Sequence, residues 1–478
     1  MKKINILMVT SLFLMMSCKK DFIELTPEST VSVDILYKTD KDFQDAIVGA
    51  YSILTRQGPN IWNFGDLAGD DTEQQFLTSI TQVGIDNFSI NINDNLLISS
   101  WRNYYSMISR CNLLLEKIET ADAAVVTNKN KYIGEARFLR ALAYFDLVRI
   151  FGDVPAVVTP LTTAEAYKVP REKVDKIYDD IIEKDLLDAE TKLPARNTGA
   201  DLGRATSGAA KSLLGKVYLT RKNFPKAETK LQEVTTMGYN LLADFNELFN
   251  YQKDEHHSEY IFDIEYEEGI NLGSAFTNNF APAYANVLNF YGITGQGASQ
   301  GSPSEELFTL FAANDKRKDI TVAKGYTDNN GVYIPTPTFD VRTFTKKYFT
   351  KTVRMNDSKA NWKVIRYADV LLMYAEALNE NNKTPLALDN LNKVHVRAGL
   401  TPLSGLNKDQ ARESIYLERR FELYLEGHRW FDMVRTGRAL AKMESKGMKA
   451  YMTVFPVPLS QIQLINDDAI LPQNPGYN

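Results

Sequence analysis

The sequence predicts a mainly α-helical protein in which helical hairpins form a scaffold for one loop-rich insert with a few short strands. Three observations predict this fold class. Apolar residues recur with helical spacing over five long stretches, one spacing pattern occurs twice, and helical spacing is lost between its two copies.

The five stretches have apolar residues at positions i, i+3, i+4 and i+7, the pattern of a helix that buries one face. Gly152 and Asp153 end one predicted helix, and Pro225 lies in the first turn of a later one. The predicted helices span residues 42–56, 96–119, 131–151, 174–193 and 206–221.

Small and large residues follow the same spacing at two places, with successive members separated by 3, 6, 3 and 4 residues. This order suits the helical hairpin of a tetratricopeptide (TPR) repeat, where small residues let two helices approach each other. Such hairpins would stack into an α-α superhelix; generic helical hairpins remain the alternative. The two sets are Gly215, Tyr218, Phe224, Ala227 and Leu231, and Ala375, Leu378, Thr384, Ala387 and Leu391.

Residues 251–352 are rich in glycine, asparagine, threonine and aromatic residues and lack helical spacing. Short β-prone runs at 260–266 and 343–349 predict strands. Long loops are usually functional or disordered, and the aromatic content argues against disorder. The predicted regions are a signal peptide (1–17), a lipidated tether (18–41), a helical region (42–250), a ligand-binding insert (251–352) and a C-terminal helical region (353–478).

The N-terminus has the pattern of a bacterial lipoprotein signal. Lys2 and Lys3 precede an apolar run at 4–16, which ends at Ser17 and Cys18. A small residue before cysteine suits a lipoprotein peptidase, so Cys18 is the predicted lipid attachment site. A conventional signal peptide or a buried N-terminal helix is the alternative. Several acyl chains on one cysteine would anchor the protein stably.

Composition excludes some functions. The net charge of −5 and the pI near 5.7 argue against a nucleic-acid partner, which usually requires a basic surface. Cys111 lies in an apolar helical run and is expected to be buried and inert. With Cys18 lipidated, Cys111 has no disulfide partner within the chain.

The sequence contains no catalytic constellation, so we expect a protein that is not an enzyme and holds no cofactor. It lacks a zinc-binding H-E-x-x-H motif and a nucleophile motif of the G-x-S-x-G type. The adjacent acids Asp70 and Asp71 point in different directions and give no sign of glycoside hydrolysis. The charged run from Glu418 to Glu426 is expected to stabilise its own helix by pairs at i and i+3 or i+4.

Binding is better supported. Sugar rings pack their C–H faces on aromatic rings, while their hydroxyls bind Asp, Asn, Gln and Arg. The segment 58–66 is too rich in turn formers to be helix core, and the insert places aromatics between turns. Packing in the core remains the alternative for each of them. The candidate ligand-binding residues are Trp62, Phe64, Asp70, Tyr284, Phe290 and Tyr291.

Four segments carry a family resemblance: EARFLRALAYFDLVRIFGDVP at 135–155, RYADVLLMYAEALN at 366–379, ERRFELYLEGHRWFDMVR at 418–435, and FPVPLSQI at 455–462 followed by QNPGY at 473–477. With the cysteine at position 18, they closely resemble the SusD/RagB family of Bacteroidetes nutrient-binding lipoproteins. The resemblance extends from Cys18 to the C-terminus.

The resemblance implies a SusD-like fold on the outer face of the outer membrane, held by the lipid anchor beside a SusC-like TonB-dependent transporter. It also implies TPR units that face the transporter and an oligosaccharide ligand bound in the loop-rich part. A peptide receptor of the same fold and a lid without a ligand of its own remain alternatives; an enzyme is the least favoured.

Overall fold

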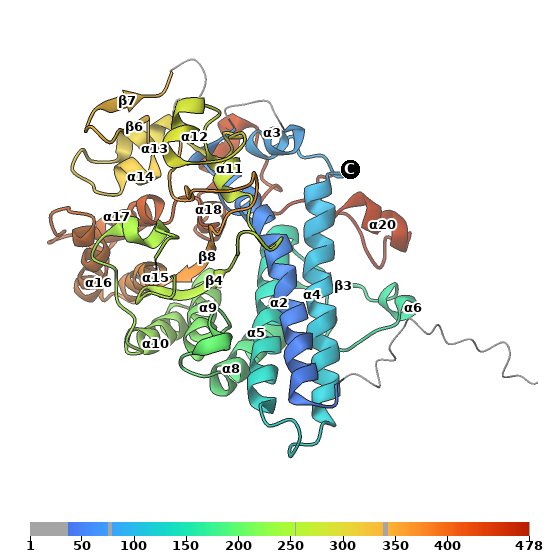
Figure 1. The fold of residues 1–478 in the computed structure, drawn as a ribbon. Helices are drawn as coiled ribbons and strands as arrows, with labels where there is room; N and C mark the ends of the chain where they lie inside the picture. Colours follow the sequence, from blue (N-terminus) through green and yellow to red (C-terminus); the bar gives the residue numbers. More distant parts are fainter. Residues whose placement is uncertain (1–36, 75–78, 254, 338–342, 478) are drawn as a thin grey trace, which may run out of the picture.

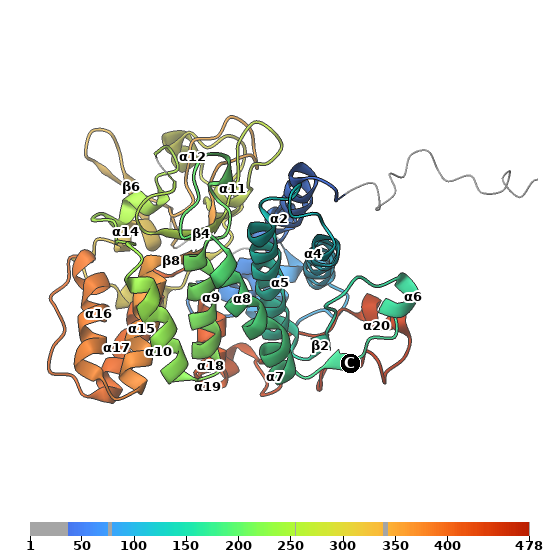
Figure 2. The same ribbon diagram turned by 90° about the horizontal axis from the view of Figure 1, so that it is seen from below.

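A computed structural model describes residues 37–74, 79–253, 255–337 and 343–477. Most of the predicted tether, including Cys18, lies outside these ranges. The core of the structure is an arc of helices, each packed on the next, which we call the helical scaffold (Figures 1 and 2). In spatial order its members are α2 (Asp40–Trp62), α4 (Asn95–Glu119), α5 (Lys129–Phe151), α8 (Glu183–Lys192), α9 (Ser207–Thr220), α10 (Phe224–Thr235), α15 (Tyr367–Glu380), α16 (Thr384–Arg397) and α17 (Lys408–Glu422).

The five predicted helical stretches are confirmed, but α2 continues past its predicted end to Trp62. The stretch 174–193 comprises α7 (Val174–Ile177), a π-helical turn, η3 (Tyr178–Ile182), and α8. Local sequence explains where they start. Thr39 and Asp42 form a capping box at the start of α2, and the Asp94 carboxylate accepts a hydrogen bond from the Leu96 amide at the start of α4. Helix α5 is buried along nearly all its faces because α4 and α8 cover it on two sides.

The two repeated spacings form two helical hairpins, α9–α10 and α15–α16. Their turns contain Lys222 and Asn382 at matching places, both with positive φ (57° and 62°). A Cβ atom on Gly215 would lie 2.5 Å from the Leu231 side chain, so the first hairpin needs glycine where its helices meet. Although far apart in sequence, the hairpins are neighbours because α10 packs on α15.

The loop-rich insert covers one side of the scaffold (Figure 1). It contains short helices and has small apolar clusters of its own, one of them centred on Tyr284, Val287 and Phe344. Strand β4 (Tyr260–Ile264) confirms the first predicted strand and pairs antiparallel with β8 (Trp362–Arg366).

The second predicted strand, at 343–349, is wrong. Its backbone makes one isolated bridge, between Phe344 and Ala323, and Lys346 N donates to Ile320 O (2.8 Å) in the short helix α14 (Lys318–Thr321). The Lys347 side chain is drawn into the protein interior, where it binds the carbonyl oxygen of Tyr424 (2.8 Å). A tertiary polar contact has therefore overridden the local β propensity.

The segment 58–66 also differs from the prediction, because α2 continues through Pro59 to Trp62 and is followed by a π-helical turn, η2 (Asn63–Leu67). Proline has no N–H for the carbonyl oxygen four residues earlier, which belongs to Thr55. The Tyr266 hydroxyl of the insert donates to this oxygen instead (2.9 Å). Gly58 leaves room for it, since a Cβ there would lie 2.2 Å from the Tyr266 oxygen.

The π-helical turn η2 is held by the C-terminal region. A Cβ atom on Gly65 would lie 2.5 Å from the Gly427 backbone, and the Asp66 carboxyl accepts a hydrogen bond from the Gly427 amide (2.7 Å). Burial raises the pKa of Asp66 well above its usual value. The end of α2 is therefore fixed from two sides, by the insert and by the C-terminal region.

The other helical segments are η2, α3 (Ile80–Asp86), α6 (Thr163–Ala166), α7 (Val174–Ile177), η3 (Tyr178–Ile182), η4 (Gly199–Asp201), η5 (Phe245–Phe249), α11 (Phe276–Phe280), α12 (Ala285–Tyr291), α13 (Glu305–Leu310), α14 (Lys318–Thr321), α18 (Arg429–Arg435), α19 (Ala439–Met443), η6 (Glu444–Lys446) and α20 (Leu459–Ile465). Short antiparallel pairs are formed by β1 (Thr72–Glu73) with β5 (Ser302–Pro303), β2 (Val154–Pro155) with β3 (Arg171–Glu172), and β6 (Gly325–Thr327) with β7 (Tyr333–Pro335).

Cys111 is buried on α4, as predicted, and burial raises the pKa of its thiol to about 12. Among the residues that the structure describes, no helix combines the length and apolar character needed to cross a bilayer.

Replacing Tyr266 by Phe should lower the free energy of unfolding by about 1–3 kcal/mol, because the Thr55 carbonyl then loses its substitute donor inside the protein. Chemical denaturation of the soluble chain measures the loss. Tyr451→Phe is the matched control, since Tyr451 is 37% exposed. Equal stability of the two variants would contradict the role assigned to Tyr266.

Candidate functional site

An open polar cleft of about 590 Å³ lies where the scaffold meets the insert. We call it the polar cleft. Its walls come from the end of α2, the start of α3, the first half of α4 and two residues of the insert. It is lined by Pro59, Asn60, Trp62, Asn63, Ser79, Thr81, Gln82, Asn95, Leu96, Ile98, Ser99, Arg102, Asn103, Asn279 and Gln300.

Helix α4 contributes a polar stripe to the polar cleft. Asn95, Ser99, Arg102 and Asn103 lie at helical positions i, i+4, i+7 and i+8, so they share one face. The opposite face carries apolar core residues such as Trp101. A helix with this pattern presents amides, a hydroxyl and a guanidinium to whatever occupies the cleft.

Hydrogen bonds hold parts of the cleft wall in place. The side-chain nitrogen of Asn60 lies 3.3 Å from the Ser99 hydroxyl. The side-chain nitrogen of Asn103 donates to the side-chain oxygen of Gln57 (3.1 Å). On the insert side, the backbone N–H of Gln300 donates to the backbone carbonyl oxygen of Asn279 (2.8 Å). These bonds join α2 to α4 and order the insert side of the rim.

Two buried side-chain oxygens in the lining have no partner. Within the described part of the chain, neither Asn63 Oδ1 nor Gln82 Oε1 accepts a hydrogen bond. Asn63 is 5% exposed and Gln82 is 7% exposed. A buried acceptor without a donor costs about 1–3 kcal/mol. Both side chains line the cleft, so their oxygens are candidate acceptors for a hydroxyl-bearing ligand.

Arg102 is the charged residue in this lining. It is exposed, and among the residues that the structure describes it makes no hydrogen bond or ion pair. The remaining polar lining residues are neutral amides and hydroxyls. Within the described part of the chain, the cleft therefore offers many neutral hydrogen-bonding groups and one free positive charge.

Two of the six candidate ligand-binding residues lie at the end of α2. Trp62 borders the polar cleft but is 1% exposed, and its ring packs edge-on against Phe280 (5.5 Å between centroids). Phe64 is fully buried and contacts the Phe455 ring (5.0 Å). Phe64 thus presents no free face to a ligand here, while Trp62 supports the wall of the cleft.

Asp70 is already engaged. Its two carboxylate oxygens accept hydrogen bonds from the Arg429 guanidinium (2.6 and 2.9 Å). Burial would raise the pKa of Asp70, but Arg429 and Arg420 outweigh that effect and lower it to about 2. Asp70 connects the segment after α2 to α18 and does not line the polar cleft.

The other three candidates form one aromatic cluster within the insert, away from the lining of the polar cleft. Phe290 packs on Tyr326 (4.5 Å), Tyr291 meets Phe349 edge-on (5.1 Å), and the Tyr284 hydroxyl donates to the Pro337 carbonyl oxygen (2.9 Å). Tyr284 is buried, whereas Phe290 and Tyr291 are half-buried. The structure thus brings these three together and separates them from Trp62.

The polar residues of the cleft are not among the site residues predicted from the sequence, most of which are aromatic. One signal could have found part of the site, namely the polar stripe at 95, 99, 102 and 103 on an otherwise apolar helix. No sequence pattern joins this stripe to Gln82, Asn279 or Gln300, because only the folded chain brings them together.

Comparison with known proteins identifies the family. Residues 258–477 match the SusD family, and residues 21–219 match a family described as starch-binding and associating with the outer membrane. The chain belongs to the SusD/RagB family. This confirms the resemblance of the four motifs and the mainly α-helical SusD fold.

Relatives agree along almost the whole chain. A SusD-like protein of Formosa agariphila is 28% identical, over 98% of this chain and 99% of its own length. A solved laminarin-binding SusD-like protein is 28% identical with a TM-score of 0.78, covering 92% of this chain and all of that one. Surface glycan-binding protein A from Bacteroides thetaiotaomicron, solved with laminarihexaose, shares the fold at 21% identity (TM-score 0.78, 91% of this chain, all of that one).

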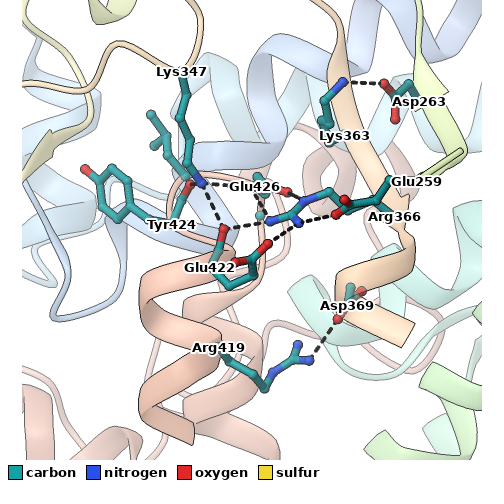
Figure 3. Close-up of polar contacts among 12 residues, drawn as sticks. Glu259, Asp263, Lys347, Lys363, Arg366, Asp369, Arg419, Glu422, Tyr424 and Glu426 are labelled. Carbon is teal, nitrogen blue, oxygen red and sulfur yellow. Dashed lines mark hydrogen bonds and ion pairs between the residues drawn. The ribbon is translucent and has the colours of Figure 1, made fainter. Parts of the chain in front are cut away.

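A second group of polar residues in this SusD-family chain is a buried charge network (Figure 3). At its centre, Arg366 pairs with Glu426 (2.7 Å), Glu259 (3.0 Å) and Glu422. Lys347 binds Glu426 (2.8 Å). The network continues through Arg397 and Arg317 to Asp315 and Glu418.

Perturbed pKa values are common at catalytic sites, and several groups of this network have them. Burial, partly offset by Glu426, lowers the pKa of Lys347 to about 8. For Glu422 the effect of burial is outweighed by Arg397, Arg366 and Arg317, and its pKa is lowered. Arg366, Lys347 and Glu422 are at most 1% exposed. Arg366 is paired with Glu422, and Lys347 is paired with Glu426, so a substrate has no access to them.

The network is therefore structural, as expected for the run from Glu418 to Glu426, but its pairs are not the predicted ones within a helix. They are tertiary, and so is the pair of Arg420 with Asp71 (2.6 Å). Trp101 and Trp430 are also core residues. Among the described residues, no group of His, Cys, Asp or Glu side chains has the arrangement of a metal site.

Replacing Arg366 by Met should lower the free energy of unfolding by about 3–5 kcal/mol, because Glu422 and Glu426 are left buried without their main partner. Chemical denaturation measures it. In the control Arg438→Met, a more exposed pair with Glu413 is lost, and the expected cost is below about 1 kcal/mol. A similar loss of unfolding free energy in both variants would contradict the conclusion that the buried charge network stabilises the fold more than an exposed ion pair does.

Proposed function

We propose that this chain is an outer-membrane lipoprotein, exposed on the cell surface, that binds an oligosaccharide in the polar cleft without turning it over. The observation that carries the proposal is the lining of this cleft by neutral amides and hydroxyls around Trp62, with two acceptors that await a donor. Sugar hydroxyls both donate and accept, so they match such a lining.

The comparisons support the same ligand class. The solved relative at 28% identity is named for laminarin binding, and one matching family is described as starch-binding. The cleft is also open and already formed, so a chain-like ligand can enter sideways and extend beyond it. An open site leaves part of the ligand hydrated, which suits a receptor that must release its cargo.

We further propose that Cys18 carries the lipid anchor and that the protein delivers its ligand to a SusC-like TonB-dependent transporter. The apolar run at 4–16 ending at Ser17 supports the anchor, and the family's association with the outer membrane supports the location. The segment between Cys18 and α2 would then let the body move over the transporter.

The polar cleft can be tested by filling it. Asn95 is an exposed lining residue at the start of α4, and Asn95→Trp should weaken oligosaccharide binding at least about tenfold by occupying the space. Calorimetric titration with a neutral and acidic oligosaccharide panel measures affinity. Asn93→Trp, exposed two residues away and outside the lining, should leave affinity unchanged.

The aromatic cluster provides the competing location. If Tyr291→Ala abolishes binding while Asn95→Trp does not, the ligand binds at Tyr284, Phe290 and Tyr291 instead. Binding of peptides but of no oligosaccharide would favour the peptide receptor, and absence of any ligand would favour a lid.

The anchor has its own test. Cys18→Ser should abolish incorporation of radiolabelled palmitate and move the protein from the membrane fraction to the soluble fraction of the producing cells, because no thiol remains for lipid attachment. Cys111→Ser serves as the control and should keep both the label and the membrane location. Membrane retention of a labelled Cys18→Ser variant would contradict the assignment.

A further inference from the structure

The charge distribution of the polar cleft restricts the kind of glycan it suits. Among the lining residues that the structure describes there is one cation, Arg102, and no carboxylate. The whole chain carries a net charge of −5, so this local excess of positive charge runs against the overall balance. A ligand with negative charge meets no opposing group within this lining.

Arg102 is positioned to use its charge on a ligand. It lies one turn after Ser99 and next to Asn103 on the polar stripe of α4, with its side chain exposed. Other arginines around the fold are committed to carboxylates, such as Arg429 to Asp70 and Arg435 to Glu376. Arg102 has no such partner among the described residues, so its donors are available to the cleft.

A guanidinium presents paired N–H donors that match the two oxygens of a carboxylate or a sulfate ester. A neutral sugar uses only one or two of these donors and leaves the charge without a counterion. An acidic sugar compensates the charge, and its hydroxyls can still bond to the neutral groups of the lining. In the same lining, the neutral groups would therefore bind the hydroxyls of the sugar ring, and Arg102 would bind its acidic substituent.

We propose that the ligand is an acidic oligosaccharide and that Arg102 binds its carboxylate or sulfate group. This inference rests on the proposed function and specifies the ligand class of the same cleft. Arg102 acts as the specificity-determining residue, and the neutral amides and hydroxyls supply the part of the affinity that all sugars share.

The test starts with the full mature chain on a glycan array that holds neutral, uronate-bearing and sulfate-bearing oligosaccharides. The bound set should be acidic, and the two acidic classes separate carboxylate from sulfate recognition. Each bound glycan is then titrated beside its carboxyl-reduced or desulfated counterpart. The acidic form should bind at least about tenfold more tightly at 50 mM salt, and the preference should shrink at 500 mM because salt screens the charge.

Arg102→Gln should remove this preference and leave affinity for the neutral counterpart within about twofold, whereas Arg102→Lys should retain part of the preference. Arg56→Gln is the matched control, because Arg56 is an exposed arginine of α2 outside the lining. An acid preference that survives Arg102→Gln, or disappears in Arg56→Gln, would overturn the assignment to Arg102.

The outcomes separate this inference from the proposed function. Binding of neutral glycans only, or equal affinity for acidic and reduced forms, would overturn the inference and leave an oligosaccharide receptor. Absence of binding to neutral, uronate-bearing and sulfate-bearing oligosaccharides alike would contradict both this inference and the proposed function.

Discussion

The buried charge network around Arg366 is the interaction on which the arrangement of the whole molecule depends. Moving a charged group out of water costs several kcal/mol, and this is recovered only when every partner is in place. Here the partners come from the residue before β4, the end of β8, the insert and α17 with its following turn. A partly assembled network leaves charges buried without partners, so an insert seated in another position is strongly disfavoured. The network thus selects one orientation of the insert on the scaffold.

That orientation shapes the polar cleft, because one rim belongs to the insert and the other to α2 and α4. Three further contacts extend the same constraint to the cleft wall. The Tyr266 hydroxyl replaces the missing Pro59 donor on Thr55, Trp62 packs on Phe280, and β1 pairs with β5. The end of α2 with Asn60 and the following turn η2 with Asn63 are consequently held by residues from the insert. The polar cleft and the buried charge network are thus linked through the insert, whose position both of them depend on.

The sequence predicts the scaffold well because helical periodicity is a local signal, and the boundaries of α4, α5 and α9 follow from it within a few residues. It predicts the two hairpins because their spacing encodes where helices touch. It fails at 58–66 and 343–349, where tertiary contacts of Tyr266 and Lys347 override local propensity. For the site, the segments around Trp62 and the insert are indicated, but the sequence cannot say which rings are exposed. Phe64 is buried in the core. The amides of the cleft form a site only when three segments that are distant in sequence come together in the fold.

The division of charge within the fold follows from these constraints. Many of the described arginines and carboxylates are paired with each other and hold the chain together, as Asp70 and Arg429 do. What remains for a ligand in the polar cleft is a set of neutral groups on helices whose positions are already fixed. Binding then orders little of the protein, so more of the interaction energy appears as affinity. Neutral groups discriminate poorly between similar sugars, because every such sugar presents hydroxyls in several directions. Discrimination must come from a group that differs in kind from the rest of the lining. Among the lining residues that the structure describes, that group is the guanidinium of Arg102, which has no partner there.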